Sequence, residues 1–130
     1  MHHIIETDQA PAPIGPYSQA VRAGDTIYVS GNIAIDPATG ELKIDNLEEE
    51  TRLVLSNLRA VLQEAGADFQ HVVKCSIFLS DMALFPRVNA VYAEAFSQNP
   101  PARETVAVAG LPKGVNVEIS AVACLTFVND

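Results

Sequence analysis

LEEETRLVLSNLRAVLQEA (residues 47–65), followed by VVKCSIFL (residues 72–79), decides the fold class, because it joins a long helix to a buried strand. Apolar side chains recur in the first stretch at three- and four-residue spacing, which predicts an amphipathic helix. Asn46 can cap its start, with Glu49 in the position that completes a capping box, and Gly66 can end it. The apolar stripe consists of Leu47, Thr51, Val54, Leu55, Leu58, Val61, Leu62 and Ala65.

The second stretch alternates between apolar and polar side chains, which predicts a strand with one buried face. The side chains expected to point inward are Val73, Cys75, Ile77 and Leu79, and those expected to point outward are Lys74 and Ser76. A second helix is predicted over 85–97, where Pro86 is tolerated in the first turn. Its expected buried face comprises Phe85, Val88, Tyr92, Ala95 and Phe96.

The flanking segments predict further strands. We expect a short edge strand at 4–6, a strand at 17–23 and another at 26–30, the last two joined by a tight turn at Gly24 and Asp25. The prolines of 10–16 predict an ordered loop.

Towards the C-terminus, 105–109 and the long alternating segment 115–125 predict two more strands, and 36–40 predicts a turn. This order implies one α+β domain over 1–130, with two helices packed on one face of a mixed sheet.

Composition and charge argue against several classes of protein. The formal net charge is −8 and the eight basic residues are scattered, which disfavours binding to nucleic acid. No apolar stretch approaches the roughly twenty residues of a membrane span, and the start of the chain has no export signal. We therefore expect a cytoplasmic protein in which Cys75 and Cys124 are reduced thiols. Hydrophobic residues make up 48% and charged residues 18%, which indicates that partner chains cover some apolar surface.

Arg103 is the first candidate for a binding residue. Pro100 and Pro101 stiffen the chain immediately before it, because each proline fixes its own φ and restricts the residue before it. A guanidinium group on such a lead-in suits the bidentate capture of a small carboxylate.

Three separated groups of motifs carry a resemblance to a known family. They are APIGPYSQA (12–20) with IYVSG (27–31), PAR (101–103), and LPKG (111–114) with VEI (117–119). In this order and spacing, and over nearly the whole chain from about residue 7 to 123, the sequence resembles the RidA family of reactive-intermediate deaminases, also called the YjgF family. That resemblance implies a chorismate-mutase-like fold in which three chains pack their sheets into a barrel-like homotrimer, with a ligand cleft at each interface.

The resemblance also implies the chemistry. The family's substrates are small 2-imino acids, such as 2-iminobutanoate and 2-iminopropanoate (with its enamine form, 2-aminoacrylate), which are hydrolysed to 2-keto acids and ammonia. It assigns catalytic roles to Arg103, which binds the carboxylate, to Glu118, which holds the attacking water, and to Tyr17 in the cleft. It assigns further substrate contacts to Ser30, Gly31, Asn89, Thr105 and Ala107. No metal and no other cofactor are expected.

Five positions depart from the family pattern, and they put the substrate preference in doubt more than the reaction class. They are Asn32, Glu104, Thr105, Gly110 and Ser120. A carboxylate next to Arg103 could weaken substrate capture, but neighbouring strand residues point to opposite faces, so we expect Glu104 to face away.

Other functions share parts of this pattern. A regulatory protein that binds small carboxylates would use Arg103 without turnover, whereas only an enzyme needs Glu118 to handle water. An endoribonuclease or translation inhibitor is disfavoured by the acidic charge balance. A chaperone that acts through exposed apolar surface conflicts with the burial of that surface in a trimer.

Overall fold

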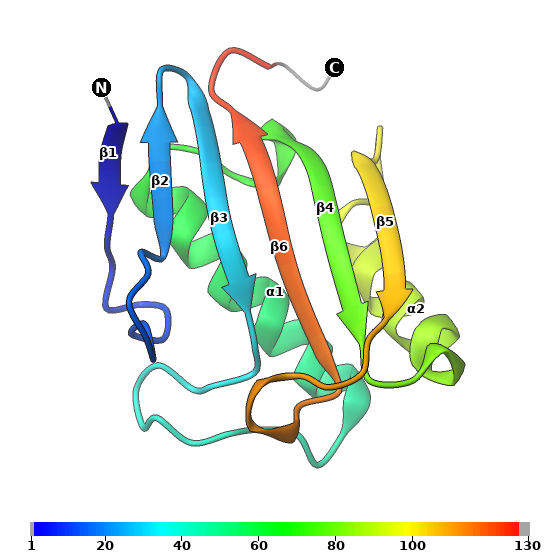
Figure 1. The fold of residues 1–130 in the computed structure, drawn as a ribbon. Coiled ribbons are helices and arrows are strands. Elements are labelled where there is room, and N and C mark those ends of the chain that lie inside the picture. The colour runs from blue at the N-terminus through cyan, green and yellow to red at the C-terminus, as the bar shows by residue number, and fades with distance from the viewer. Residues whose placement is uncertain (1, 128–130) are drawn as a thin grey trace.

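A six-stranded mixed sheet forms the centre of the fold, and both long helices cover one of its faces (Figure 1). The computed structural model describes residues 2–127. The strands are β1 (His2–Ile5), β2 (Ala20–Ala23), β3 (Thr26–Asn32), β4 (Val72–Leu79), β5 (Ala102–Ala107) and β6 (Val117–Cys124), and the helices are α1 (Leu47–Glu64) and α2 (Phe85–Ala95). Short 3₁₀ turns lie at Phe69–His71, Met82–Leu84 and Pro112–Gly114. The predicted α+β class, with two helices on one face of a mixed sheet, is confirmed.

The strand order is β1-β2-β3-β6-β4-β5, so the last strand of the chain lies in the middle of the sheet. Only β4 and β5 run parallel, which is possible because α2 provides the crossover between them. The other neighbours are antiparallel. This topology places β6, and the ends of β3 and β4 beside it, at the centre of the molecule.

Helix α1 forms where the apolar stripe predicts it, and every residue of that stripe is buried. The Asn46 side chain accepts a hydrogen bond from the Glu49 backbone N–H at 2.9 Å, which caps the first turn. The chain leaves the helix through Gly66, whose φ of +84° suits glycine.

The inward faces of β4 and β6 alternate as predicted, with one exception. A register shift between Val72 and Lys74 places Val72 in the core, whereas Val73 is only partly buried. The prediction that Val73 points fully inward was therefore wrong, because a bulge breaks strict alternation at the start of the strand.

Several element boundaries also differ from the predictions, and β1, expected at 4–6, is His2–Ile5. β2 begins at Ala20 rather than Tyr17, because the Tyr17 backbone N–H donates to the Gly15 carbonyl within the loop. β5 begins at Ala102, where pairing with Lys74 of β4 recruits Arg103 into the sheet. Helix α2 ends at Ala95, two residues earlier than predicted.

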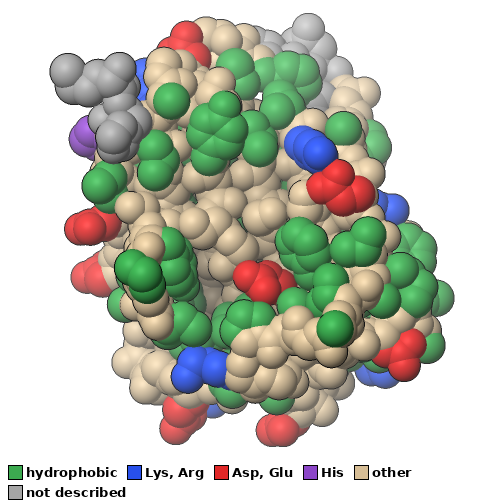
Figure 2. Space-filling model, viewed as in Figure 1, with side chains coloured by type: hydrophobic (Ala, Val, Ile, Leu, Met, Phe, Trp, Pro, Cys, Tyr) green, Lys and Arg blue, Asp and Glu red, His purple; other side chains and the backbone are tan. Residues whose placement is uncertain are grey.

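The second face of the sheet carries no helix. Figure 2 looks onto this open face and shows several hydrophobic side chains among uncharged surface, with few charged groups. Tyr28 is 53% exposed there, and Val106 is 40% exposed. Apolar side chains gathered on one uncovered face are typical of a surface that binds a partner.

Both cysteines are free thiols, with Cys75 buried and Cys124 partly exposed. Among residues 2–127, the longest helices lack the apolar length that crossing a lipid bilayer requires.

Candidate functional site

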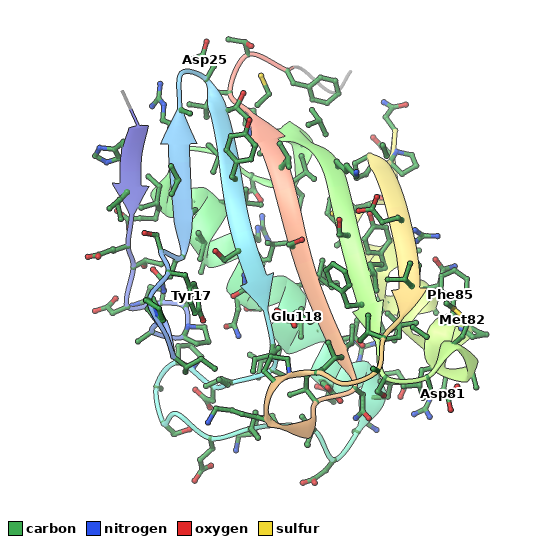
Figure 3. All side chains as sticks on the ribbon, in the orientation of Figure 1. Tyr17, Asp25, Asp81, Met82, Phe85 and Glu118 are labelled. Atoms are coloured by element: carbon green, nitrogen blue, oxygen red, sulfur yellow. The ribbon has the colours of Figure 1, made fainter. Side chains whose placement is uncertain are left out.

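The predicted site residues fall into two groups on opposite faces of the sheet. Glu118 lies between Val117 and Ile119, which are buried beneath α1, so its own side chain points to the open face. Arg103 is paired with Cys75, which is buried on the helix side, and its guanidinium contacts α2. Figure 3 shows Glu118 on the open face, with Tyr17 on the β2 side and Phe85 of α2 beyond β5.

The first group surrounds Glu118 in a small cavity of about 50 Å³. The carboxyl shares this cavity with mostly apolar side chains, and burial raises the pKa of Glu118 above its ordinary value. The cavity is lined by Pro11, Ala12, Ile14, Tyr17, Gln19, Ser30, Gly31, Asn32, Ile33, Ile35, Pro112 and Glu118. A carboxyl in such surroundings can exchange a proton closer to neutral pH than an exposed one.

Gly31 is required for the position of that carboxyl. A Cβ atom at residue 31 would lie only 2.8 Å from Cδ of Glu118, and closer still to one carboxyl oxygen. The absence of a side chain therefore lets the Glu118 carboxyl lie against the β3 backbone. The family resemblance had assigned Gly31 to the substrate, and the structure adds this steric role.

The N-terminal loop forms one wall of the cavity through Pro11, Ala12 and Ile14, and Gln19 holds this loop in place. The Gln19 side chain is 6% exposed; its Oε1 accepts from the Thr7 N–H at 2.7 Å, and its Nε2 donates to the Thr7 and Pro11 carbonyls at 3.0 and 2.8 Å. This role was missed from the sequence. Its only signal there is a glutamine between a proline-rich loop and a strand.

Tyr17 and Ser30 both line the same cavity as Glu118. Tyr17 is 47% exposed, so its ring forms part of the rim. The Ser30 hydroxyl donates to the Ser18 carbonyl at 2.6 Å, which joins β3 to the loop. Asn32 donates from Nδ2 to the Ser30 carbonyl at 3.1 Å, so this departure from the family pattern makes a local backbone contact.

The second group surrounds Arg103 at the β5 edge. Its Nη1 donates to Oδ1 of Asn89 at 2.8 Å, and the guanidinium lies 4.9 Å from the ring centroid of Tyr92 and 5.4 Å from that of Phe85. Three residues of α2 thus orient an exposed cation. The geometry gives Asn89 a contact with the arginine, and the two aromatic contacts were missed because they depend on the packing of α2 on β5.

Further polar groups lie near this arginine. The Thr105 side chain is partly buried, and its hydroxyl oxygen has no hydrogen-bond partner among residues 2–127. Burial raises the pKa of Cys75 to about 11, so its thiol stays protonated at neutral pH. Ala107 lies exposed at the end of the same strand, where it pairs with Leu79.

Glu104 faces away from Arg103, as predicted. Its carboxyl pairs with Nζ of Lys74 at 2.9 Å and also accepts from the Ser76 hydroxyl, both on the open face. These contacts lower the pKa of Glu104, the Ser76 hydrogen bond most of all. The carboxylate next to Arg103 therefore leaves the guanidinium available to an anion.

Within one chain, the Arg103 group and the Glu118 group are too far apart to contact the same small ligand. Arg103 is level with Cys75 of β4, whereas Glu118 is level with Phe78, three residues further on and two strands away from β5. From the spacing of residues and strands, their Cα atoms lie roughly 14 Å apart. Their side chains point to opposite faces of the sheet. The structure brings Tyr17, Ser30 and Gly31 to Glu118, and Asn89 to Arg103. Within residues 2–127, no three His, Cys, Asp or Glu side chains are grouped as metal ligands.

The chain is similar to many known proteins. A family model described as "Endoribonuclease L-PSP" matches residues 7–125. The 2-iminobutanoate/2-iminopropanoate deaminase of Capra hircus is 47% identical over 123 residues, which cover 95% of this chain and 90% of the relative.

Solved structures agree in fold. A crystal structure of a putative endoribonuclease from Thermotoga maritima has a TM-score of 0.93 and 50% identity, covering 95% of this chain and 98% of that one. E. coli TdcF, solved with bound serine, has a TM-score of 0.90 and 38% identity, covering 94% and 98%. Residues 7–125 include both groups of site residues, so the comparisons extend over the whole candidate site.

Proposed function

We propose that this chain, which belongs to the RidA (YjgF) family, hydrolyses small 2-imino acids to 2-keto acids and ammonia. Substrates of this class are 2-iminobutanoate and 2-iminopropanoate, the compounds in the name of the goat relative. The observation that carries the proposal is the Glu118 carboxyl, desolvated in a small cavity and held against Gly31. A carboxyl in that setting can take a proton from water as a general base and give it to the imine nitrogen as a general acid.

The reaction needs little more than a held carboxylate and a directed water molecule. Glu118 accepts a proton from water as the water oxygen forms a bond to the imine carbon. Glu118 returns this proton to the nitrogen, which gives a carbinolamine. The carboxylate then takes the proton of the new hydroxyl group and passes it to the amine, the C–N bond breaks, ammonia leaves, and the carbon becomes the carbonyl of the 2-keto acid. Arg103 binds the substrate carboxylate through its paired N–H donors.

The two groups meet if the β5 edge of one chain, which carries Arg103, lies against the open sheet face of its neighbour, in the homotrimer that the family resemblance implies. The exposed apolar side chains of the open face support such burial, among them Tyr28 and Val106. In that assembly, Arg103 of one chain would complete the cavity around Glu118 of its neighbour. A small carboxylate would then span the interface.

Cleavage of RNA, which the name of the family model suggests, has less support. Sixteen acidic residues against eight basic ones give a net charge of −8, and a polyanion binds through concentrated positive charge. A protein that senses small carboxylates without turnover would use Arg103 but would gain nothing from a desolvated Glu118.

The proposal is tested by following the disappearance of an imine. An amino-acid oxidase or a threonine dehydratase generates the imine in situ, and a nucleophile such as semicarbazide traps what remains. We expect the wild-type protein to lower the trapped fraction and Arg103→Ala to leave it at the level without protein. Binding of 2-ketobutanoate by the wild type with no change in trapped imine would identify a sensor and overturn the enzymatic function.

A further inference from the structure

Helix α1 carries two buried polar side chains that the apolar stripe does not account for. Glu50 is 0% exposed and Asn57 is 1% exposed, although both lie on the side of the helix that faces the sheet. Burying such groups is costly unless they form hydrogen bonds, so their partners indicate what they do.

The Glu50 carboxyl is bonded through both oxygens to one residue. Its Oε2 accepts from the Asn116 backbone N–H at 2.8 Å, and its Oε1 accepts from Nδ2 of Asn116 at 2.7 Å. The Asn116 carbonyl in turn accepts from the Ser80 N–H at 3.0 Å. Asn116 is thus fixed between α1 and the end of β4, one residue before β6 begins and two residues before Glu118.

Asn57 holds a second backbone segment, one that lines the cavity. Its Nδ2 donates to the carbonyls of Ile33 and Ile35 at 3.2 and 2.9 Å. This segment follows Gly31 by two residues, and both isoleucines line the cavity. Helix α1 therefore holds the exit of β3 and the entry of β6, the two backbones whose close approach brings Gly31 against Glu118.

From this double anchoring we propose that Glu50 is a positioning residue for Glu118, acting through Asn116. The contact between Gly31 and the Glu118 carboxyl leaves no room for a methyl group, so a small shift of the β6 entry changes where the carboxyl lies. The effect on turnover rests on the proposed function. The effect on the surroundings of Glu118 does not.

The variants separate positioning from general stability. Glu50→Ala removes both acceptors and leaves the partly buried Asn116 N–H without its carboxylate partner. Glu50→Gln keeps one acceptor, and the Asn116 amide can turn to accept from the glutamine. We expect kcat for the imine to fall about 10- to 100-fold in Glu50→Ala, in line with the effect of small misplacements, and about threefold or less in Glu50→Gln. The dissociation constant for 2-ketobutanoate should stay within about twofold of wild type, because Arg103 is untouched.

Leu62→Ala is the matched control, because Leu62 is fully buried near the other end of α1. It should lower the melting temperature and leave kcat unchanged. Asn116→Ala keeps the backbone bond and loses the amide bond, so it tests the same link if Glu50→Ala does not fold, and its kcat should lie between those of wild type and Glu50→Ala.

A second readout is independent of turnover. NMR titration of ¹³C-carboxyl-labelled Glu118, assigned by comparison with Glu118→Gln, reports its surroundings directly. Other titratable groups also face this region. Tyr17 lines the same cavity, and the Lys74–Glu104 pair lies on the open face of β4 and β5. The variants change none of these residues, so a shift in the Glu118 midpoint reports on the position of Glu118. We expect the Glu118 midpoint to move down towards its ordinary value in Glu50→Ala and to stay in place in Glu50→Gln and Leu62→Ala.

A Glu50→Ala protein with unchanged Glu118 titration and unchanged kcat would overturn the inference, as would an equal loss of kcat in Leu62→Ala. If the wild type shows no imine hydrolysis while the titration moves as expected, the proposed function fails and the positioning role stands.

Discussion

The Arg103 group and the Glu118 cavity differ in how the fold holds a charged side chain. Arg103 is exposed, and an asparagine and two aromatic rings of α2 orient it. Glu118 is half-buried among apolar side chains, and burial raises the pKa of its carboxyl. The Arg103 guanidinium is thus oriented while it stays in contact with water. The Glu118 carboxyl is partly removed from water, which brings its pKa closer to neutral pH. This difference suits one group to binding and the other to proton transfer.

The largest expected effect separates these two roles by substitution. Glu118→Gln removes the general base and should lower kcat by about two to four orders of magnitude, while the dissociation constant of 2-ketobutanoate changes little. Arg103→Ala should weaken binding of the same ligand by at least about 30-fold, from the roughly 2 kcal/mol or more that loss of a hydrogen-bonded charge partner costs. Single-turnover kinetics and calorimetric titration measure the two effects.

Glu104→Gln serves as the control for Arg103→Ala, because it removes a neighbouring charge that faces the open side. It should retain binding. A Glu118→Gln protein that binds weakly but turns over normally would reverse the assigned roles.

The second prediction concerns whether the two groups act in one chain or between chains. Equal amounts of Arg103→Ala and Glu118→Gln, unfolded together and refolded, form mixed oligomers. If each site takes its arginine from one chain and its acid from the next, about a quarter of the sites regain both groups in a random mixture. We therefore expect activity to rise from background to about a quarter of wild type.

Mixing the two folded proteins without exchange should give no recovery, and neither should refolding either variant alone. A refolded mixture that stays at background would show that both groups must come from the same chain.

The comparison of the two groups also explains what the sequence could predict. The stripe of α1 and the alternation of β4 and β6 follow from local spacing, so these elements and, apart from Val73, their buried faces were predicted correctly. The opposite orientation of Glu104 and Arg103 follows from strand alternation alone. The bulge at Val72 was not predictable in this way, because it depends on how β4 pairs with β6.

The parts of the site that were missed depend on contacts between distant segments. Phe85 and Tyr92 meet Arg103 only because α2 crosses over to the parallel strand β5. Glu50 and Asn57 left a signal, since they fall three residues after Leu47 and Val54 and thus on the apolar side of α1. A polar residue at such a position is unusual enough to predict a buried hydrogen-bonded contact.

The third prediction tests whether α2 presets Arg103. Asn89→Ala removes the acceptor 2.8 Å from Nη1, so the guanidinium must be ordered by the ligand instead. We expect KM for the imine to rise about 2- to 10-fold with kcat unchanged, because one hydrogen bond contributes about 0.5–1.5 kcal/mol. Steady-state kinetics at several imine concentrations give both constants.

Arg87→Ala is the matched control on the same helix, because Arg87 pairs with Glu48 on the surface, away from Arg103. Its KM should equal that of wild type. If Asn89→Ala binds as well as wild type, the rings of α2 alone suffice to orient the arginine.

The smallest expected effect is on stability, and it concerns Glu118 alone. Burial raises the pKa of this carboxyl in the folded protein above its value in the unfolded chain. At neutral pH the folded state therefore bears the cost of a desolvated charge, which Glu118→Gln removes. The variant should melt roughly a few degrees higher than wild type near pH 7.

The sign of this difference fixes its pH dependence. A raised carboxyl pKa means that the folded state binds the proton more tightly than the unfolded state. The stability of the wild type therefore rises relative to that of Glu118→Gln as pH falls through the folded-state pKa. The gap in melting temperature should close below the ordinary carboxyl pKa of about 4.3, where Glu118 is protonated in both states. Thermal melts of both proteins between neutral and acidic pH measure it, with exposed Glu6→Gln as the control. A Glu118→Gln variant that is less stable than wild type at neutral pH would mean that the carboxylate is stabilised where it lies, and the contrast with Arg103 would lose its physical basis.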